Sequence, residues 1–207
     1  MEETQIQFLT RFIVESDAIE NIQANSELVQ SQLRNGEQKG HVGALVLMDS
    51  LAQEKKQFLT EDLVCRIQGL ITAEQHTKPG GPKLKPEWIG KYRLVNLSIK
   101  GRIAPHPTLI PSLMRSWVIR TVAWQRSCSD LFAANLTEIA DLHYEYERVH
   151  PFVDGNGRSG RALVYYLLCY CGITPFVFTS GDKYKTYYRC FDNREAMRRY
   201  FASRTGL

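Results

Sequence analysis

The chain has 207 residues, a formal net charge of +4 and a hydrophobic fraction of 43%. This length and composition are typical of one globular domain with a sizeable core, and they exclude a fibrous or largely disordered chain. The small positive charge does not by itself indicate a nucleic-acid partner, and we expect none.

The N-terminus and the cysteines bear on where the protein works. The first five residues are polar and acidic, unlike a signal peptide, and no apolar run is long enough to span a bilayer. We therefore expect a cytoplasmic protein with no membrane partner. The five cysteines include no C-x-x-C pair, so the sequence predicts neither a disulfide framework nor a zinc site.

Apolar residues at helical spacing predict helices over 8–22, 42–52 and 60–71. A segment rich in Pro and Gly, 76–86, predicts a loop, and residues 92–99 with the basic turn after them predict a small β-hairpin. Further helices are expected over 113–124, over 131–149, from about 158 to 171, and over 183–204 as one helix or a pair. The expected fold class is all-α, a helical bundle with one small β-hairpin.

One glycine-rich stretch, His150-Pro-Phe-Val-Asp-Gly-Asn-Gly-Arg-Ser-Gly-Arg161, lies between two predicted helices. Gly155 and Gly157 allow backbone N–H groups to approach an anion closely at a helix N-terminus. Arg158 and Arg161 are three residues apart, so both can project from the first helical turn and fork onto phosphate oxygens. The stretch therefore predicts an anion site.

Three other side chains of this stretch add chemistry to the anion site. Asp154 is a hard oxygen ligand, suited to holding Mg²⁺ jointly with phosphates. Asn156 can donate to a phosphate oxygen, and His150 can act as a base near neutral pH. A base, a metal ligand, an anion cradle and two arginines predict a phosphate-transfer site rather than an acyl-transfer site.

The same stretch matches every fixed position of H-P-F-x-D/E-G-N-G-R-x-x-R, the signature of the Fic family. The segments 90–93 and 103–107 resemble the approach to, and the exit from, the substrate-docking flap of that family. The resemblance runs from about Phe8 to the end of the chain. It implies a single Fic domain over 1–207, a Fic-type helical bundle with a β-hairpin flap, an N-terminal inhibitory helix region over 1–30 and a catalytic core over 90–207.

The resemblance implies a protein adenylyltransferase, which transfers AMP from ATP to a Ser, Thr or Tyr hydroxyl of a target protein. By this likeness His150 would be the general base, and Asp154 would hold Mg²⁺ or Mn²⁺. Asn156 and the glycine N–H groups would hold the α-phosphate. Arg158 and Arg161 would hold the β- and γ-phosphates. Some relatives that act as kinases carry a lysine where this chain has Gly157, which argues against kinase chemistry here.

The segment Ser16-Asp-Ala-Ile-Glu20-Asn21 resembles the family's inhibitory motif S/T-x-x-x-E-G/N, in the N-terminal placement of class II members. If Glu20 pairs with Arg161, a carboxylate stands where the γ-phosphate charge should lie. The plainer alternative is an amphipathic helix on which Glu20 is a solvated charge. Some family members use the same glutamate to remove AMP from modified proteins, and the sequence does not choose between these roles.

Two further regions complete the expected site. Ile99, Lys100, Gly101 and Arg102 would form the flap tip over the nucleotide, where the flap pairs with a target segment by strand addition. The alternative is a surface hairpin with a basic tip. Tyr187 and Tyr188 resemble the tyrosine pair near the adenine pocket of the family, although they could equally be core aromatics.

Other functions stay open at this stage. These are removal of AMP as the main reaction, binding of a nucleotide or partner without turnover, and transfer of a different group such as UMP or phosphocholine. The expected partners are ATP and a target protein docked on the flap, and the resemblance also allows a homodimer.

Overall fold

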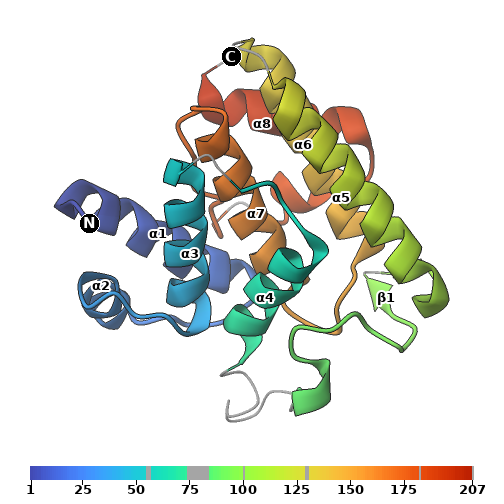
Figure 1. The fold of residues 1–207 in the computed structure, drawn as a ribbon, viewed down its shortest axis with the longest axis horizontal. Coiled ribbons are helices and arrows are strands. Elements are labelled where there is room, and N and C mark those ends of the chain that lie inside the picture. Colours follow the sequence, from blue (N-terminus) through green and yellow to red (C-terminus); the bar gives the residue numbers. More distant parts are fainter. Residues whose placement is uncertain (55–56, 74–83, 100, 129–130, 182, 207) are drawn as a thin grey trace.

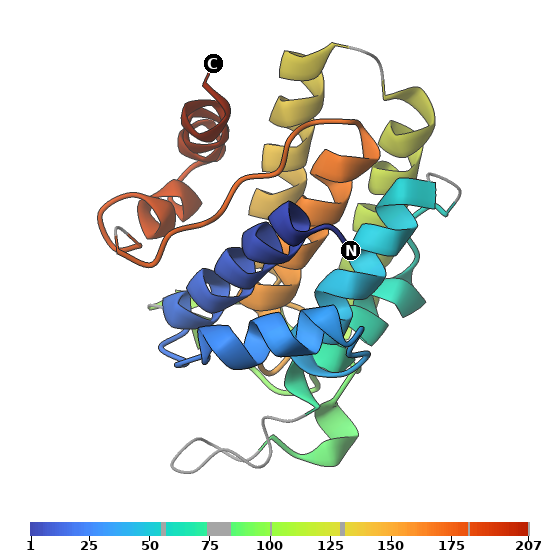
Figure 2. The same ribbon diagram turned by 90° about the vertical axis from the view of Figure 1, so that its left-hand side faces the viewer.

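The computed structural model describes residues 1–54, 57–73, 84–99, 101–128, 131–181 and 183–206. Across these ranges the chain forms eight α-helices and one antiparallel sheet of two short strands (Figures 1 and 2). The expected all-α fold with one small hairpin is confirmed. None of the described helices has the length and apolar character that a membrane span requires.

The four N-terminal helices are α1 (Glu3–Ile19), α2 (Ser26–Arg34), α3 (Gly40–Glu54) and α4 (Glu61–Thr72). The four C-terminal helices are α5 (Ile110–Ser127), α6 (Phe132–Val149), α7 (Asn156–Tyr170) and α8 (Arg194–Thr205). Three short 3₁₀ helices are η2 (Pro86–Trp88), η3 (Pro107–Leu109) and η4 (Tyr187–Phe191). The strands are β1 (Ser98–Ile99) and β2 (Arg102–Ile103).

Helix α7 lies at the centre of the bundle, where it contacts α1, α3, α4 and α6 (Figure 1). Every residue from Ala162 to Leu168 is at most 2% exposed. A helix that is buried on all sides belongs to the middle of a core. Groups at the start of α7 are therefore held on one of the most constrained elements of the molecule.

Helix α1 is part of the same core. Leu9, Phe12 and Ile13 are at most 1% exposed. The Phe12 ring packs edge-on against Tyr165 of α7, with 5.7 Å between ring centroids, and against Phe178 at 6.4 Å. This packing fixes the direction of α1 and brings its C-terminal end beside the start of α7.

Helix α2 was not predicted by the periodicity of the sequence. It is nine residues long, and only Val29 and Leu33 are buried, which is too few apolar positions to give a pattern. Its stability comes from its ends, because the Asn25 side chain accepts a hydrogen bond from Leu28 N at 2.9 Å. The first helix also differs from the prediction, since it begins at Glu3 and ends at Ile19 rather than covering 8–22.

The hairpin is shorter than expected, with Ser98 paired to Ile103 and Ile99 to Arg102. Gly101 has φ = 81°, a backbone angle that glycine adopts without strain, and Lys100 lies outside the described residues. The residues from 92 to 97 are not a strand. Near the C-terminus the expected helix or pair of helices over 183–204 is found as a pair, η4 followed by α8.

Candidate active site

The loop between α6 and α7 is a sharp reversal of the chain. His150 ends α6 with φ = 50°, in the left-handed region, and its N–H donates to Tyr146 O at 2.9 Å. Gly155 precedes α7 with φ = 78°, and a Cβ there would overlap Thr72 Cγ2 of α4. Gly155 adopts this angle without strain and leaves the space that Thr72 occupies, whereas a left-handed angle is uncommon for a residue such as His150.

Two buried side chains fasten this loop to the base of the flap. The Arg93 guanidinium is fully buried and donates to His150 O at 2.8 Å, Val95 O at 2.9 Å and Pro105 O at 2.7 Å. The Gln68 side chain donates to Asp154 O at 2.9 Å. Because these bonds satisfy loop carbonyls inside the protein, the position of His150 relative to the flap is fixed.

A pocket of about 340 Å³ opens between this loop, the flap and η4. It is lined by Glu20, Ile99, Arg102, Glu147, His150, Gly157, Arg161, Tyr187, Tyr188, Phe191 and Asp192. Residues far apart in the sequence thus line one cavity. They include the predicted base, a predicted phosphate-binding arginine, two flap residues, the two tyrosines and the predicted inhibitory glutamate. Among the other predicted residues, Lys100 lies outside the described residues and the rest do not line this pocket, whereas Glu147, Phe191 and Asp192 line it without a predicted role.

Arg161 and the end of α1 are joined by several hydrogen bonds. The fully buried Arg161 donates from Nη2 to Glu20 Oε1 and Ser16 O, at 2.8 and 2.9 Å, and from Nε to Ser16 Oγ at 2.9 Å. Burial raises the pKa of Glu20, but the charge of Arg161, its hydrogen bond to Glu20 and the charge of Arg158 act together against burial, and the pKa is held below its ordinary value. Glu20 is therefore an ionised partner of Arg161 rather than a solvated surface charge.

The Glu20 carboxylate also lies against the first turn of α7. A Cβ added to Gly157 would overlap Glu20 Oε1 and come within 3.0 Å of Arg161 Nη1. The first amide groups of a helix have no helical acceptor and attract anions. Glu20 thus occupies an anion position between the α7 N-terminus and Arg161.

The His150 imidazole is largely buried, with 20% of its side chain exposed. Burial lowers the pKa of His150 to about 4, so the ring is uncharged at neutral pH. Its Nδ1 is buried, and no hydrogen-bond partner for this atom is found among the described residues. Nε2 is therefore the nitrogen available to a group in the pocket.

Asn156 and Arg158, two further residues of the motif, contact other groups of the protein. Both ends of the Asn156 side-chain amide bond to Phe152, with Oδ1 accepting from its N and Nδ2 donating to its O, each at 2.9 Å. Arg158 is 2% exposed, and its Nη2 lies 3.3 Å from Asp154 Oδ1. In this conformation Asn156 braces the loop, and the phosphate contacts expected of Asn156 and Arg158 stay predictions.

Asp154 is the candidate metal ligand, and its side chain is 42% exposed. Its Oδ1 accepts from Gly155 N. Within the described ranges, no cluster of three or more His, Cys, Asp or Glu side chains could hold a metal ion. One exposed carboxylate fits Mg²⁺ or Mn²⁺ only when phosphate oxygens and water complete the coordination.

The two tyrosines on the η4 side differ in setting. Tyr187 is 1% exposed, its hydroxyl lies 2.9 Å from His143 Nε2, and its ring centroid is 5.9 Å from the Arg161 guanidinium carbon. Tyr188 is half-buried and donates to Ile19 O at 3.1 Å. Tyr187 is thus both a core aromatic and part of the pocket wall, and a role in adenine binding stays a prediction for both.

Lys183 is buried, and no feature of the sequence predicts a role for it. Its Nζ donates to Ala18 O at 3.2 Å, Ile19 O at 2.8 Å and Asn21 Oδ1 at 2.8 Å. Asn21, with φ = 59°, is left-handed. The segment before η4 therefore caps the C-terminal end of α1, next to Glu20.

The flap is tied to the end of α6 by Arg102. Its guanidinium donates to Arg148 O at 3.1 Å and to Glu147 O at 3.4 Å, carbonyls that have no partner within the helix. Ile103, next to it, is 81% exposed. The predicted flap residue Arg102 thus positions the hairpin beside the pocket.

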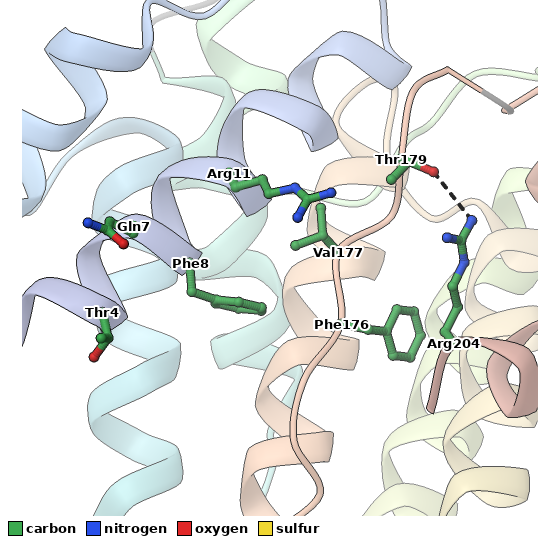
Figure 3. A pocket seen from close by; sticks show the side chains of 8 residues that line it. All are labelled: Thr4, Gln7, Phe8, Arg11, Phe176, Val177, Thr179 and Arg204. Carbon is green, nitrogen blue, oxygen red and sulfur yellow. Dashed lines mark hydrogen bonds between the residues drawn. The ribbon is translucent and has the colours of Figure 1, made fainter. Parts of the chain in front are cut away.

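A separate hollow of about 480 Å³ lies between α1, the segment 176–179 and α8 (Figure 3). Arg204 donates to Thr179 Oγ1 across it at 3.3 Å. Its lining side chains include no acid and no histidine, and no predicted site residue lies there. We therefore assign no function to this hollow.

Residues 58–168, more than half of the chain, match the family model described as Fic/DOC family. The chain belongs to the Fic/DOC family. The matched range includes the motif, the loop between α6 and α7, and the flap. It does not include α1, so membership alone says nothing about Glu20.

Relatives and solved structures agree with this membership. The chain is 34% identical over 101 residues to the protein adenylyltransferase Fic of Drosophila melanogaster, covering 48% of this chain and 19% of that protein. With the Nematostella vectensis protein of the same name, identity is 25% over 158 residues, covering 76% and 34%. The matched part of the chain therefore spans only about a fifth to a third of the length of these relatives.

Two solved structures share the fold. A Fic-domain-containing signalling protein from Bacteroides thetaiotaomicron superimposes with a TM-score of 0.73 at 22% identity, covering 97% of this chain and 84% of that one. The Fic-1 protein of C. elegans gives a TM-score of 0.74 at 18% identity, covering 99% and 61%. At such identities the likeness establishes the fold alone.

Proposed function

We propose that this Fic/DOC protein is an adenylyltransferase that moves AMP from ATP to a Ser, Thr or Tyr hydroxyl of a target protein, with Glu20 as its built-in inhibitor. The relatives' names support the reaction. The observation that carries the inhibitory part is the ion pair of Glu20 with Arg161, made over the first turn of α7.

In the proposed reaction, His150 Nε2 takes the proton of the target hydroxyl. The hydroxyl oxygen then bonds to the α-phosphorus, and the bond from that phosphorus to the bridging oxygen of pyrophosphate breaks. Amide groups at the start of α7 and the Arg161 guanidinium hold phosphate oxygens as charge develops on them. Mg²⁺ or Mn²⁺, held by Asp154 together with the phosphates, would supply further neutralisation of that charge.

The proposed inhibition is a competition for one position. Glu20 already fills the space between Gly157 and Arg161, where a terminal phosphate would bind. Two like charges about 4 Å apart repel by about 4 kcal/mol at an effective dielectric constant near 20. A triphosphate must therefore displace Glu20 or bind in a different, unproductive arrangement.

The first test compares three proteins incubated with Mg²⁺ and ATP, followed by intact-mass measurement. We expect an adenylyl adduct on Glu20→Gly, a weak one on the parent and none on Glu20→Gly/His150→Ala. Because self-modification depends on a suitable residue, the same proteins are also given radiolabelled ATP with a cell extract as target source. Absence of label from Glu20→Gly in both assays would count against transfer. Equal labelling of parent and Glu20→Gly would count against inhibition.

Removal of AMP is the second candidate function. Glu20 lines the same pocket as His150, so its carboxylate is placed to activate a water against an AMP-modified side chain. Incubating the parent and Glu20→Gly with a target modified beforehand separates the two functions. Faster loss of AMP with the parent than with Glu20→Gly would favour removal.

We also propose that the protein works in the cytoplasm, docks its target protein on the flap and forms a homodimer.

A further inference from the structure

Glu147 lies one helical turn before His150, on the last turn of α6. It is 9% exposed and lines the same pocket. Its Oε2 is 3.9 Å from His150 Nδ1, on the side of the ring opposite to the available Nε2. The reaction proposed above gives Glu147 no role.

Two buried polar atoms at this contact lack hydrogen bonds. Within the described part of the chain, neither Glu147 Oε1 nor His150 Nδ1 has a hydrogen-bond partner. A buried polar atom without a partner costs free energy, so native structures contain few of them. The main-chain carbonyl of Glu147 also faces the imidazole and raises the pKa of His150, but it does not reach hydrogen-bond geometry. A hydrogen bond between the two groups requires the Glu147 carboxyl to approach Nδ1 more closely than the present 3.9 Å.

Room for this carboxyl is provided by a glycine at a variable position of the motif. A Cβ on Gly160 would overlap Glu147 Oε1 and would lie 3.1 Å from Tyr146 Cδ1. Gly160 is helical and needs no special backbone angle, so its value here is space. Glu147 and Gly160 therefore form a matched pair between α6 and α7.

We propose that Glu147 is a positioning residue for His150: the Glu147 carboxylate accepts a hydrogen bond from Nδ1–H of His150, which leaves the lone pair of Nε2 free for the target hydroxyl. This rests on the proposed function. The hydrogen bond made by one imidazole nitrogen sets the protonation of the other. A carboxylate on Nδ1 selects the tautomer that can act as a base at Nε2, and it stabilises the imidazolium that forms.

The proton balance is simple. The hydroxyl proton moves to Nε2 as the oxygen bonds to the α-phosphorus and pyrophosphate leaves. The imidazolium keeps its Nδ1–H bonded to Glu147, and the proton on Nε2 passes to solvent after the products separate. Glu147 itself gains and loses no proton in this cycle.

The charged groups around Glu147 determine the pH at which its carboxylate is present. Burial raises the pKa of Glu147 to about 8; Arg161 of α7 and Arg102 of β2 lower it, and Glu20 raises it. The other titratable groups that face it are His143, Tyr146, His150, Tyr187 and Tyr188. The carboxylate form therefore increases as the pH rises through about 8, and base strength at Nε2 should increase with it.

The test uses Glu20→Gly as the active background and adds Glu147→Gln, which keeps the shape and removes the charge. We expect the kcat for transfer to fall about 10- to 100-fold while the KM for ATP changes by less than about twofold. The rise of kcat between pH 6 and 9 should be lost in Glu147→Gln and partly kept in Glu147→Asp. Spectra of ¹⁵N-histidine, with His150 assigned by its loss in His150→Gln, should show the Nδ1–H tautomer in the background protein and its decrease in Glu147→Gln.

Glu87→Gln, at an exposed acid on η2, is the matched control for loss of one carboxylate. If the Glu20→Gly background transfers no AMP, the proposed function fails, and the tautomer spectra still test Glu147. If that background is active and Glu147→Gln keeps its rate, pH profile and tautomer, the inference about Glu147 is wrong. A folded Glu147→Gln protein with unchanged kcat and higher KM would equally overturn it, because that pattern would make Glu147 a binding residue.

Discussion

Arg161 is the residue on which the two states of the site depend. Its guanidinium is fully buried and is satisfied by Glu20, the Ser16 hydroxyl and the Ser16 carbonyl. A buried cation is costly unless it is paired, so one anion or another must stay beside it. In the proposed cycle that anion is either the Glu20 carboxylate or a phosphate of the nucleotide.

The pairing predicts how stability depends on pH. The folded pKa of Glu20 is below its ordinary value of 4.5, so the unfolded chain takes up this proton first as the pH falls. The stabilisation is present above that ordinary value and is lost as the pH falls through the folded pKa. We expect Glu20→Gln to be less stable than the parent by about 1–3 kcal/mol at pH 7. This difference should shrink below pH 4.5 in urea unfolding. A difference that does not change with pH would mean that the charge of Glu20 is not what stabilises Arg161.

A second residue-scale prediction concerns the metal. Asp154→Asn keeps the acceptor for Gly155 N and removes the carboxylate charge. In the Glu20→Gly background, we expect it to weaken ATP binding about tenfold or more in the presence of Mg²⁺ and to leave binding in EDTA unchanged. Titration calorimetry under both conditions measures this. Equal weakening in EDTA would show that Asp154 acts on the loop rather than through a metal.

At this scale the sequence predicted the residues whose spacing is fixed by a short loop or a known motif. His150, Gly157 and Arg161 meet in one pocket because a glycine-rich turn can bring them together in only a few ways. Lys183 could not be predicted, because its contact with the end of α1 is made across 164 residues of chain. Glu147 has a local signal in the sequence, because it precedes His150 by three residues and residues three apart lie on one face of a helix.

Among the elements, the C-terminal end of α1 depends on the segment before and within η4. Its last carbonyls are bonded by Lys183 Nζ and by the Tyr188 hydroxyl, and Asn21 receives a further bond from Lys183. Such bonds satisfy the carbonyls that a helix leaves unpaired at its end. Glu20, the proposed inhibitory residue, is therefore held in place by the same side of the pocket that carries Tyr187 and Tyr188.

Because Lys183 bonds to the end of α1, we predict that Lys183→Met partly relieves the proposed inhibition by Glu20. Without its three donations, the end of α1 is less firmly held, and we expect a several-fold rise in AMP transfer over the parent, below the rate of Glu20→Gly. Stability should fall by about 1–2 kcal/mol. Lys185→Met, at an exposed lysine two residues on, is the matched control. If Lys183→Met transfers AMP at the parent rate, the bonds made by Lys183 do not contribute to inhibition.

Helices with a regular repeat of apolar residues were predicted well from the sequence. Helices that depend mainly on hydrogen bonds at their ends were predicted poorly. Helix α6 was expected over 131–149 and is found over Phe132–Val149. Helix α2 was missed because its stability depends on the Asn25 cap and on packing of two side chains. Residues 92–97 were expected to be extended and paired, but the Arg93 side chain is tied to the motif loop instead.

For the whole molecule, α1, which carries the proposed inhibitory residue Glu20 at its end, is not an appendage to a separate unit. One continuous core includes Ile6 near the start and Phe201 near the end. The aromatic rings of Phe8 and Phe12 on α1 pack against Tyr165 of α7. An inhibitory residue carried on a core helix can be displaced by a local change at its end, whereas displacement of the entire helix would expose the core.

Deleting residues 1–22 is therefore expected to damage the fold rather than simply activate the enzyme. Leu9, Phe12 and Ile13 would leave the faces of α7 and its neighbours uncovered, and truncating even one buried Phe to Ala typically costs about 3–5 kcal/mol. We expect the deletion protein to lose its cooperative thermal transition and to bind a dye for exposed apolar surface, while Glu20→Gly keeps a sharp transition. Scanning calorimetry and dye fluorescence on both proteins test this. A sharp transition for the deletion protein, with transfer as fast as that of Glu20→Gly, would instead make α1 a detachable inhibitor and place the core entirely in the helices that follow.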